Sequence, residues 1–353
     1  MRRAIGWAVL VVLALLAGCT PAVPRPPVTF AVVAGAYYSA DGKVAVDAAV
    51  VEDSERLLRR VVQDINSRKG VDMVLVAGDL LARADPLSLD RARAILDELR
   101  PSYYIVLGEH DGPALRAKGE AAPEAAPPAA TAPSAPGPGP RGESRSTVIW
   151  AFQGHGFTGA EGYWVCEAKP GVVIVGLDTV SPGRRAGHID AQQLAWLERA
   201  LSAHAGKMVI VVAHHGLIPM HPLDEGAAWA HLMVDNAAEV RAVLEKHANV
   251  VMVVTASHHF AGSRVSGRIV YLSSPSVSVW PLAYHLVRVD RENAEAVWVP
   301  LAPEWLARQA QDRLLASPAY RGVFAAGEDG DTACVRLFGG NKLQVVPLPG
   351  IRP

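Results

Sequence analysis

The sequence predicts an α/β fold with two sheets, because short apolar runs of strand length alternate with segments that repeat apolar residues at helical spacing. The runs that predict strands are residues 30–33, 73–77, 104–107, 172–177, 208–213 and 250–255. Most of these runs stop at a glycine, an aspartate or a histidine. Two more strands, at residues 268–272 and 285–289, predict that a second sheet closes the domain.

Helices are predicted where apolar residues recur every three to four positions, at residues 53–66, 87–99, 190–203, 236–247 and 304–315. Asp190 and Asn236 are the predicted N-caps of two of them. Residues 117–146 consist mostly of alanine, proline and glycine, which cannot bury enough apolar surface to become ordered. The sequence therefore predicts one domain over residues 28–301, interrupted by a disordered loop at 117–146 and followed by an extension at 302–353.

Composition limits the class of protein. Half of the 353 residues are hydrophobic and 20% are charged, which supports a large buried core and excludes disorder of the whole chain. The formal net charge of -1 provides no long-range field that would attract nucleic acid. We therefore expect no nucleic-acid partner.

The N-terminus carries an export signal. Arg2 and Arg3 precede an apolar run at residues 4–17, which is short for a permanent membrane span. Gly18 and Cys19 follow this run, and the segment Leu16-Ala17-Gly18-Cys19 resembles the lipobox of bacterial lipoproteins. The resemblance implies a signal peptide at residues 1–19, a lipid on Cys19 and a tether at 20–27. The alternative is an uncleaved anchor helix. Thr20, rather than aspartate, follows the cysteine and favours the outer membrane facing the periplasm, in a host with two membranes.

Two cysteines remain if Cys19 carries lipid. Cys166 and Cys334 would then share a compartment that permits disulfides. The sequence leaves open whether they form a disulfide or remain two separate buried thiols, because it does not give the Cα–Cα distance that a disulfide requires.

Four aspartate or histidine motifs follow predicted strands. They are Gly78-Asp79, the Gly-Glu-His-Asp segment at residues 108–111, His214-His215 and His258-His259. Because an α/β sheet gathers its ligand-binding residues at the carboxyl ends of its strands, we expect these side chains to meet in one site.

In order and spacing, these motifs resemble those of the calcineurin-like metallophosphoesterases, which read Asp-x-His, Gly-Asp, Gly-Asn-His-Asp, His and Gly-His-x-His. The resemblance covers about residues 28–301 and includes the segments at 163–197 and 271–275. It implies a sandwich of two sheets flanked by helices (αββα). It also implies a phosphomonoester or phosphodiester substrate and two divalent cations about 3.5 to 4 Å apart.

The resemblance also implies a role for each matching residue. Asp79 would bridge the two cations, His259 would bind the first cation and His214 the second. His110 would protonate or stabilise the leaving oxygen, and Asp111 would hold the His110 imidazole in the useful tautomer.

Three motif positions depart from the family pattern. Gly35 and Tyr37 stand where the first motif has aspartate and histidine. Ser257 stands where the last motif has its first histidine, unless a local shift brings His258 into that role. Asp41, in the loop after the first motif, is a second candidate to restore a lost ligand.

Glu109 replaces the asparagine of the third motif but still offers an oxygen ligand. The first cation would thus keep only Asp79 and His259, whereas the second would keep Asp79, Glu109 and His214. Two protein ligands rarely hold a catalytic ion and three often do, so we expect one ion of zinc, manganese or iron rather than two.

Two functions remain open. The first is a metal-dependent hydrolase of the cell envelope that acts on a phosphorylated small molecule. The second is a catalytically inactive relative, with or without metal, that binds a phosphorylated ligand or an envelope partner without turning it over.

Overall fold

The computed structural model describes residues 26–112, 144–181, 184–290, 293–320 and 343–347. The predicted signal peptide, Cys19, most of the tether, Cys334 and most of the predicted 117–146 loop lie outside these ranges. Those predictions therefore stay predictions. Within the described ranges, no helix has both the length and the apolar character needed to cross a membrane.

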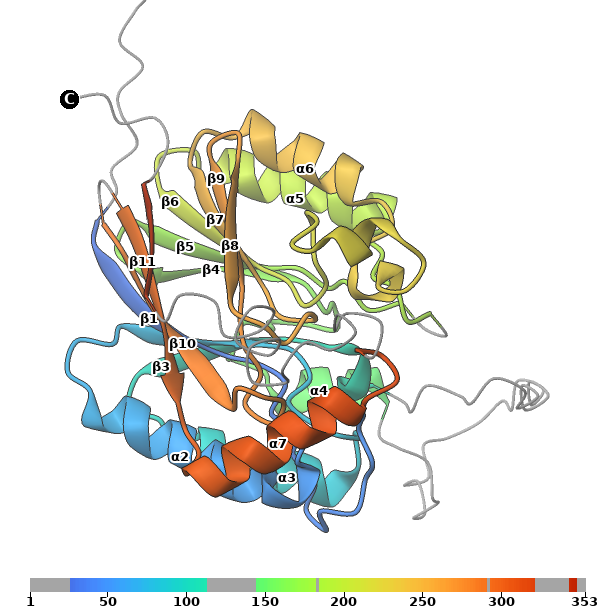
Figure 1. The fold of residues 1–353 in the computed structure, drawn as a ribbon. Coiled ribbons are helices and arrows are strands. Elements are labelled where there is room, and N and C mark those ends of the chain that lie inside the picture. The colour runs from blue at the N-terminus through green and yellow to red at the C-terminus, as the bar shows by residue number, and fades with distance from the viewer. Residues whose placement is uncertain (1–25, 113–143, 182–183, 291–292, 321–342, 348–353) are drawn as a thin grey trace, which may run out of the picture.

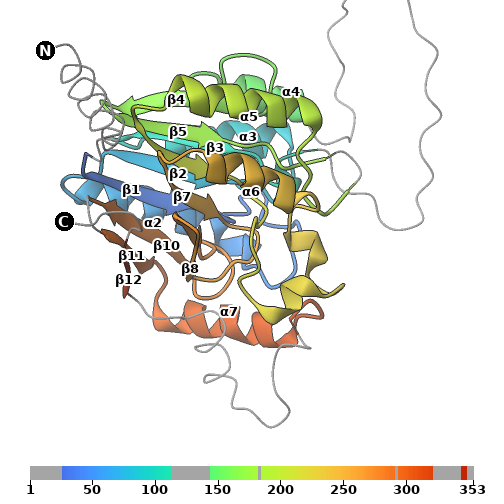
Figure 2. The same cartoon turned by 90° about the horizontal axis from the view of Figure 1, so that it is seen from above.

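Two six-stranded sheets pack against each other and form the body of the protein (Figures 1 and 2). The first sheet contains, in spatial order, β12 (Leu343–Pro347), β11 (Asn293–Pro300), β10 (Ala283–Val289), β1 (Val28–Val33), β2 (Met73–Ala77) and β3 (Ser102–Val106). The second contains β4 (Trp164–Lys169), β5 (Val172–Gly176), β6 (Met208–Val212), β7 (Val250–Thr255), β9 (Ile269–Ser273) and β8 (Gly262–Ser266). The predicted two-sheet α/β fold is confirmed.

The strands that lead into the sequence motifs are parallel. In the first sheet β1, β2 and β3 run parallel, and in the second β5, β6, β7 and β9 do so. The strands β10, β11 and β12, together with β4 and β8, are antiparallel to their neighbours. The carboxyl ends of β1, β2 and β3 therefore lie together at one edge of the first sheet, and those of β5, β6 and β7 at one edge of the second.

Helices cover the outer face of each sheet (Figure 1). On the first sheet's side lie α2 (Ser54–Ser67), α3 (Pro86–Leu96) and α7 (Glu304–Ala316), and on the second sheet's side α5 (Ala191–Ala203) and α6 (Ala237–Lys246). Figure 2 shows α7 on the side of β10, β11 and β12, far from α5. The shorter elements are α4 (Arg145–Ala151), η1 (Val51–Asp53), η2 (Glu109–Asp111), η3 (Pro222–Glu225) and η4 (Ala230–Leu232). This helix, sheet, sheet, helix order is the predicted αββα sandwich.

Successive side chains in the strands of the second sheet point to opposite faces and pack in two different hydrophobic cores. Ile174 and Ile210 face the first sheet and share a core with Phe30 of β1. Their chain neighbours Val173 and Val209 point the other way and pack in a second core with residues of α5 and α6. Because successive side chains of a strand point to opposite faces, a continuous apolar run is the pattern expected for a sheet covered on both sides.

Of the two predicted N-caps, Asp190 is confirmed and Asn236 is wrong, and the predicted end of the loop at residue 146 is also wrong. The carboxylate of Asp190 accepts a hydrogen bond from the Gln193 amide at 2.8 Å, as predicted for an N-cap. Asn236 does not cap α6: its side chain bonds to the backbone of Ile189 instead. The predicted loop also extends too far, because Ser144 caps α4 and residues 145–146 are helical.

His285 in β10 is a buried ring without a hydrogen-bond partner. It is 0% exposed, and neither ring nitrogen has a partner among the described residues. Burial lowers the pKa of His285 to about 3. In an unfolded chain a histidine has a pKa of about 6.5, so below that pH the unfolded state binds a proton that the folded state does not.

We expect acid to destabilise the protein through this group. Between pH 7 and pH 5 it should lower the free energy of unfolding by about 2 kcal/mol, because the unfolded chain alone becomes protonated there. Replacing His285→Leu should remove that part of the pH dependence. Urea unfolding of both proteins at the two pH values measures it, and equal losses of stability would contradict the prediction.

Candidate metal centre

Three side chains from three strand ends meet at the edge of the sandwich. Asp79 follows β2, Glu109 begins η2 just after β3, and His214 follows β6. The His214 Nε2 atom lies 3.1 Å from Glu109 Oε2 and 3.4 Å from Asp79 Oδ2. The predicted meeting of these residues is therefore observed.

The spacing of these atoms matches the ligands of a single ion. Ligand atoms about 2.1 Å from one metal lie about 3.0 to 3.4 Å from each other in octahedral or tetrahedral geometry. The two separations around His214 Nε2, 3.1 and 3.4 Å, fall in this range. Ligand atoms that all lie within 4.8 Å of one another come from Glu109, His214 and His215, and also from Asp79, Glu109 and His110. The side chains at this edge thus form two overlapping groups that could hold a divalent cation, and Glu109 belongs to both.

The tautomer of His214 also suits a ligand. Its Nδ1 lies 3.0 Å from the carbonyl oxygen of Ala77, and because a carbonyl only accepts, Nδ1 carries the proton. The Nε2 lone pair therefore faces two carboxylates and needs a positive charge between them. Although burial opposes it, the carboxylates of Asp79 and Glu109 raise the pKa of His214 well above its usual value, so a proton can take this place when no ion is bound.

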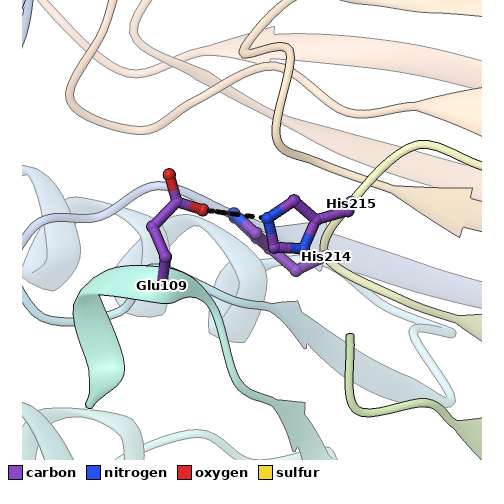
Figure 3. A group of neighbouring side chains, drawn as sticks. All are labelled: Glu109, His214 and His215. Carbon is purple, nitrogen blue, oxygen red and sulfur yellow. Dashed lines mark hydrogen bonds and ion pairs between the residues drawn. The ribbon is translucent and has the colours of Figure 1, made fainter. Parts of the chain in front are cut away.

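His215 lies beside His214 and contacts the same oxygen of Glu109 (Figure 3). Its Nε2 lies 3.1 Å from the Arg185 carbonyl oxygen and 3.3 Å from Glu109 Oε2, while its Nδ1 lies 2.7 Å from Thr179 Oγ1. A proton on Nε2 is needed to reach the carbonyl, so in this tautomer His215 donates hydrogen bonds and does not bind metal. Although burial opposes it, the hydrogen bonds from His214 and His215 hold the pKa of Glu109 well below its usual value.

The backbone around Asp79 is shaped by two glycines. A Cβ at Gly78 would lie 2.5 Å from His214 Nδ1, and one at Gly108 would lie 2.2 Å from Asp79 Oδ1. Asp79 itself has a φ of +52°, an uncommon backbone conformation that often marks functional sites. Although burial raises it, the charge on His214 lowers the pKa of Asp79 to about 2, so the carboxylate is ionised.

His110 is held differently from the prediction. Its amide donates to Asp79 Oδ1 at 3.0 Å, and its Nδ1 lies 3.1 Å from the carbonyl oxygen of Ala82. That carbonyl, and not Asp111, therefore orients the imidazole. Asp111 instead accepts hydrogen bonds from the amides of Leu81 and Gly108, both at 2.9 Å, and so shapes the loop. Burial and the nearby Asp79 raise the pKa of Asp111 to about 6.

The position of the first cation is occupied by a tyrosine. The hydroxyl of Tyr37 lies 2.8 Å from Asp79 Oδ2 and 2.8 Å from His259 Nε2, the two ligands that the first site retains. Burial, together with the charge on Asp79, raises the pKa of Tyr37 well above its usual value, so the hydroxyl keeps its proton. The residues present therefore do not fit a first cation.

The lost aspartate position is also filled. A Cβ at Gly35 would lie 2.6 Å from Ser276 Oγ, which donates a hydrogen bond to the Gly35 carbonyl at 2.8 Å. The serine hydroxyl thus takes the space that a side chain at position 35 would need.

Neither predicted substitute restores a ligand. His258 Nε2 lies 2.9 Å from Asp224 Oδ1, and both side chains are fully buried in that pair. Ser257 donates to the Leu232 carbonyl at 2.7 Å. Asp41 accepts from Ser39 and Lys43 in its own exposed loop. These contacts hold the three side chains apart from the metal cluster, although the buried His258 Nδ1 has no hydrogen-bond partner among the described residues.

The C-terminal extension reaches this region. Tyr320, just after α7, places its hydroxyl 3.0 Å from His259 Nδ1. The same segment accepts a hydrogen bond from Trp229 Nε1 at the carbonyl of Ala319, and Tyr37, Trp229 and Tyr320 share one apolar cluster. No function was predicted for this extension, yet it covers the position of the first cation.

The fold and the cluster define a class, an αββα sandwich with metal-binding side chains at the ends of its parallel strands. The sequence profile described as calcineurin-like phosphoesterase matches residues 51–256. The chain therefore belongs to the calcineurin-like phosphoesterase family. No curated protein sequence matches the chain significantly.

Solved structures share the fold at low sequence identity. A dimetal phosphatase from Danio rerio is 17% identical, with a TM-score of 0.58 over 78% of this chain and 97% of its own. PhoD is 10% identical, with a TM-score of 0.50 over 80% of this chain and 68% of its own. At these identities the similarity concerns the fold.

Proposed function

We propose that this chain is a hydrolase of phosphoric esters that works with one divalent cation. The observation that supports this most is that His214 Nε2 lies 3.1 Å from Glu109 Oε2 and 3.4 Å from Asp79 Oδ2, in a cluster with two groups of side chains that could hold a cation. Family membership adds the reaction class. Zinc, manganese and iron(II) all accept two carboxylates and an imidazole, so the donors do not select among them.

Each residue has a distinct task in this proposal. A bound cation would supply Lewis-acid stabilisation of the charge that develops on the phosphoryl oxygens. Asp79, Glu109 and His214 would hold it, and His215 would fix the Glu109 carboxylate by donating to it. His110, with its Nδ1 proton directed to Ala82, offers Nε2 as the atom that exchanges a proton with the leaving oxygen.

The proposed setting is the cell envelope. The N-terminal arginines, the apolar run and Cys19 support export and a lipid anchor, and Thr20 supports the outer membrane facing the periplasm. The proposed substrate is a phosphorylated small molecule, because the net charge of -1 provides no attraction for nucleic acid.

A second candidate function is binding without turnover, to a phosphorylated ligand or an envelope partner. The Tyr37 hydroxyl between Asp79 and His259 favours it, because this arrangement removes the second Lewis acid of the family's reaction.

Metal analysis followed by assays separates the two candidates. Protein purified without chelator should contain about one divalent ion per chain, given three protein ligands for one site. It should hydrolyse an aryl phosphate or a bis-aryl phosphodiester, lose that activity in EDTA, and regain it with zinc, manganese or iron(II). Folded protein that binds a phosphorylated ligand but shows no hydrolysis with any of these metals would favour the second candidate.

A further inference from the structure

The hydrogen bonds around Tyr37 form a chain that ends at Asp79. The Tyr37 hydroxyl donates to Asp79 Oδ2 at 2.8 Å. The 2.8 Å contact between Tyr37 and His259 Nε2 must then use a proton on that nitrogen. His259 Nδ1 is left without one and accepts from the Tyr320 hydroxyl at 3.0 Å. A directed chain thus runs from Tyr320 through His259 and Tyr37 to Asp79.

The Tyr37 hydroxyl contacts Asp79 and His259 at the place where a cation bound to both would lie. An ion bound to both would have to sit about 2.1 Å from Asp79 Oδ2 and His259 Nε2, in the space that the tyrosine oxygen fills. His259 moreover presents a proton there instead of a lone pair. Both effects oppose binding of an ion.

The tyrosine ring is fixed in this position. Tyr37 is 2% exposed, and its ring packs edge-on against the rings of His110 and His259, with centroids 5.1 and 5.7 Å away. Its amide donates to the Asp79 carbonyl at 3.1 Å. The hydroxyl therefore cannot swing aside without the loss of several contacts.

We propose that the Tyr37 hydroxyl replaces the first cation as the partner of Asp79 and His259, and that this positioning residue limits the centre to one ion. One part of this rests on the proposed function, namely that the remaining ion is bound by Asp79, Glu109 and His214. Ser276 supports this proposal. Its hydroxyl fills the space of a side chain at position 35 and donates to the Gly35 carbonyl, just as the Tyr37 hydroxyl fills the space of the first cation.

The test counts ions in variants of the full chain. Wild type and Tyr37→His are titrated with manganese, and bound ions are counted by elemental analysis and by electron paramagnetic resonance. The imidazole of Tyr37→His would join Asp79 and His259 as a third ligand, so this variant should bind one ion more than wild type. That added ion should give a spin-coupled manganese pair in place of an isolated ion.

Two controls make the count specific. Tyr37→Phe removes the hydroxyl without adding a ligand and should keep the wild-type number of ions. Tyr38→His changes the neighbouring buried tyrosine, whose hydroxyl bonds to Glu55 outside the centre, and should also add none. Circular dichroism confirms that each variant is folded.

The outcome separates this proposal from the proposed function. Two ions in wild type, or no additional ion in folded Tyr37→His, would overturn the role of Tyr37 even if the protein hydrolyses phosphoric esters. One added ion in Tyr37→His supports that role even if no ester is hydrolysed.

Discussion

Replacing Asp79→Ala should lower kcat/KM for a phosphoric ester by about a hundredfold or more, since it would remove a ligand of the proposed ion. The Asp79 carboxylate lies 3.4 Å from His214 Nε2, accepts from Tyr37 at 2.8 Å and receives the His110 amide at 3.0 Å. One change therefore removes a metal ligand and disturbs the placement of His110. The rate is measured at saturating metal, together with the metal content of the variant.

A matched change provides the control. Asp41→Ala also removes an aspartate near the first motif, but its carboxylate bonds only within an exposed loop as far as the described contacts show. It should leave the rate and the metal content unchanged. An Asp79→Ala protein that keeps both its metal and its activity would refute the proposed centre.

Replacing Trp164→Ala should lower the free energy of unfolding by about 3 to 5 kcal/mol. Trp164 begins β4, is 3% exposed, and donates from Nε1 to the carbonyl of Ile105 in β3 at 2.8 Å. It therefore joins the two sheets. A Cβ at Gly156 or Gly176 would lie 2.4 or 2.3 Å from its ring, so the backbone closes tightly around the indole and leaves a cavity when it is removed.

Urea unfolding measures this loss, and Trp150→Ala is the matched control. Trp150 is 62% exposed, so its replacement should change the free energy of unfolding by no more than about 0.5 kcal/mol. Similar losses in the two variants would show that Trp164 does not join the sheets as described.

The buried strands could be predicted because they are covered on both faces. The runs at β2, β6 and β7 are apolar at nearly every position, and every residue in them is buried. Such a run can be recognised without knowledge of the strands that pair with it. The edge strand β8 was missed because it reads Gly-Ser-Arg-Val-Ser and none of its residues is buried, so its sequence resembles a loop. Helix α4 was missed as a whole, because the loop predicted before it extends into its first residues and has the composition of a disordered chain.

The meeting of Asp79, Glu109 and His214 could be predicted from their positions after parallel strands. The roles of Tyr37 and Ser276 could not, because they depend on contacts between segments 222 and 241 positions apart and on the direction of each side chain. His215 was named in its motif without a role, although its place beside His214 was the available signal. The partners of Asp111 are backbone amides, which no motif reveals.

Ser276 prevents a substitution at Gly35 alone from supplying a metal ligand there. Aspartate tolerates a φ of +54°, so the backbone at Gly35 would not forbid its return. The obstacle is the serine oxygen 2.6 Å from the new Cβ, which would have to leave in the same step, while Tyr37 would still block the ion. A ligand at position 35 therefore requires a change at Ser276 as well, and the ion would still need the space that Tyr37 fills.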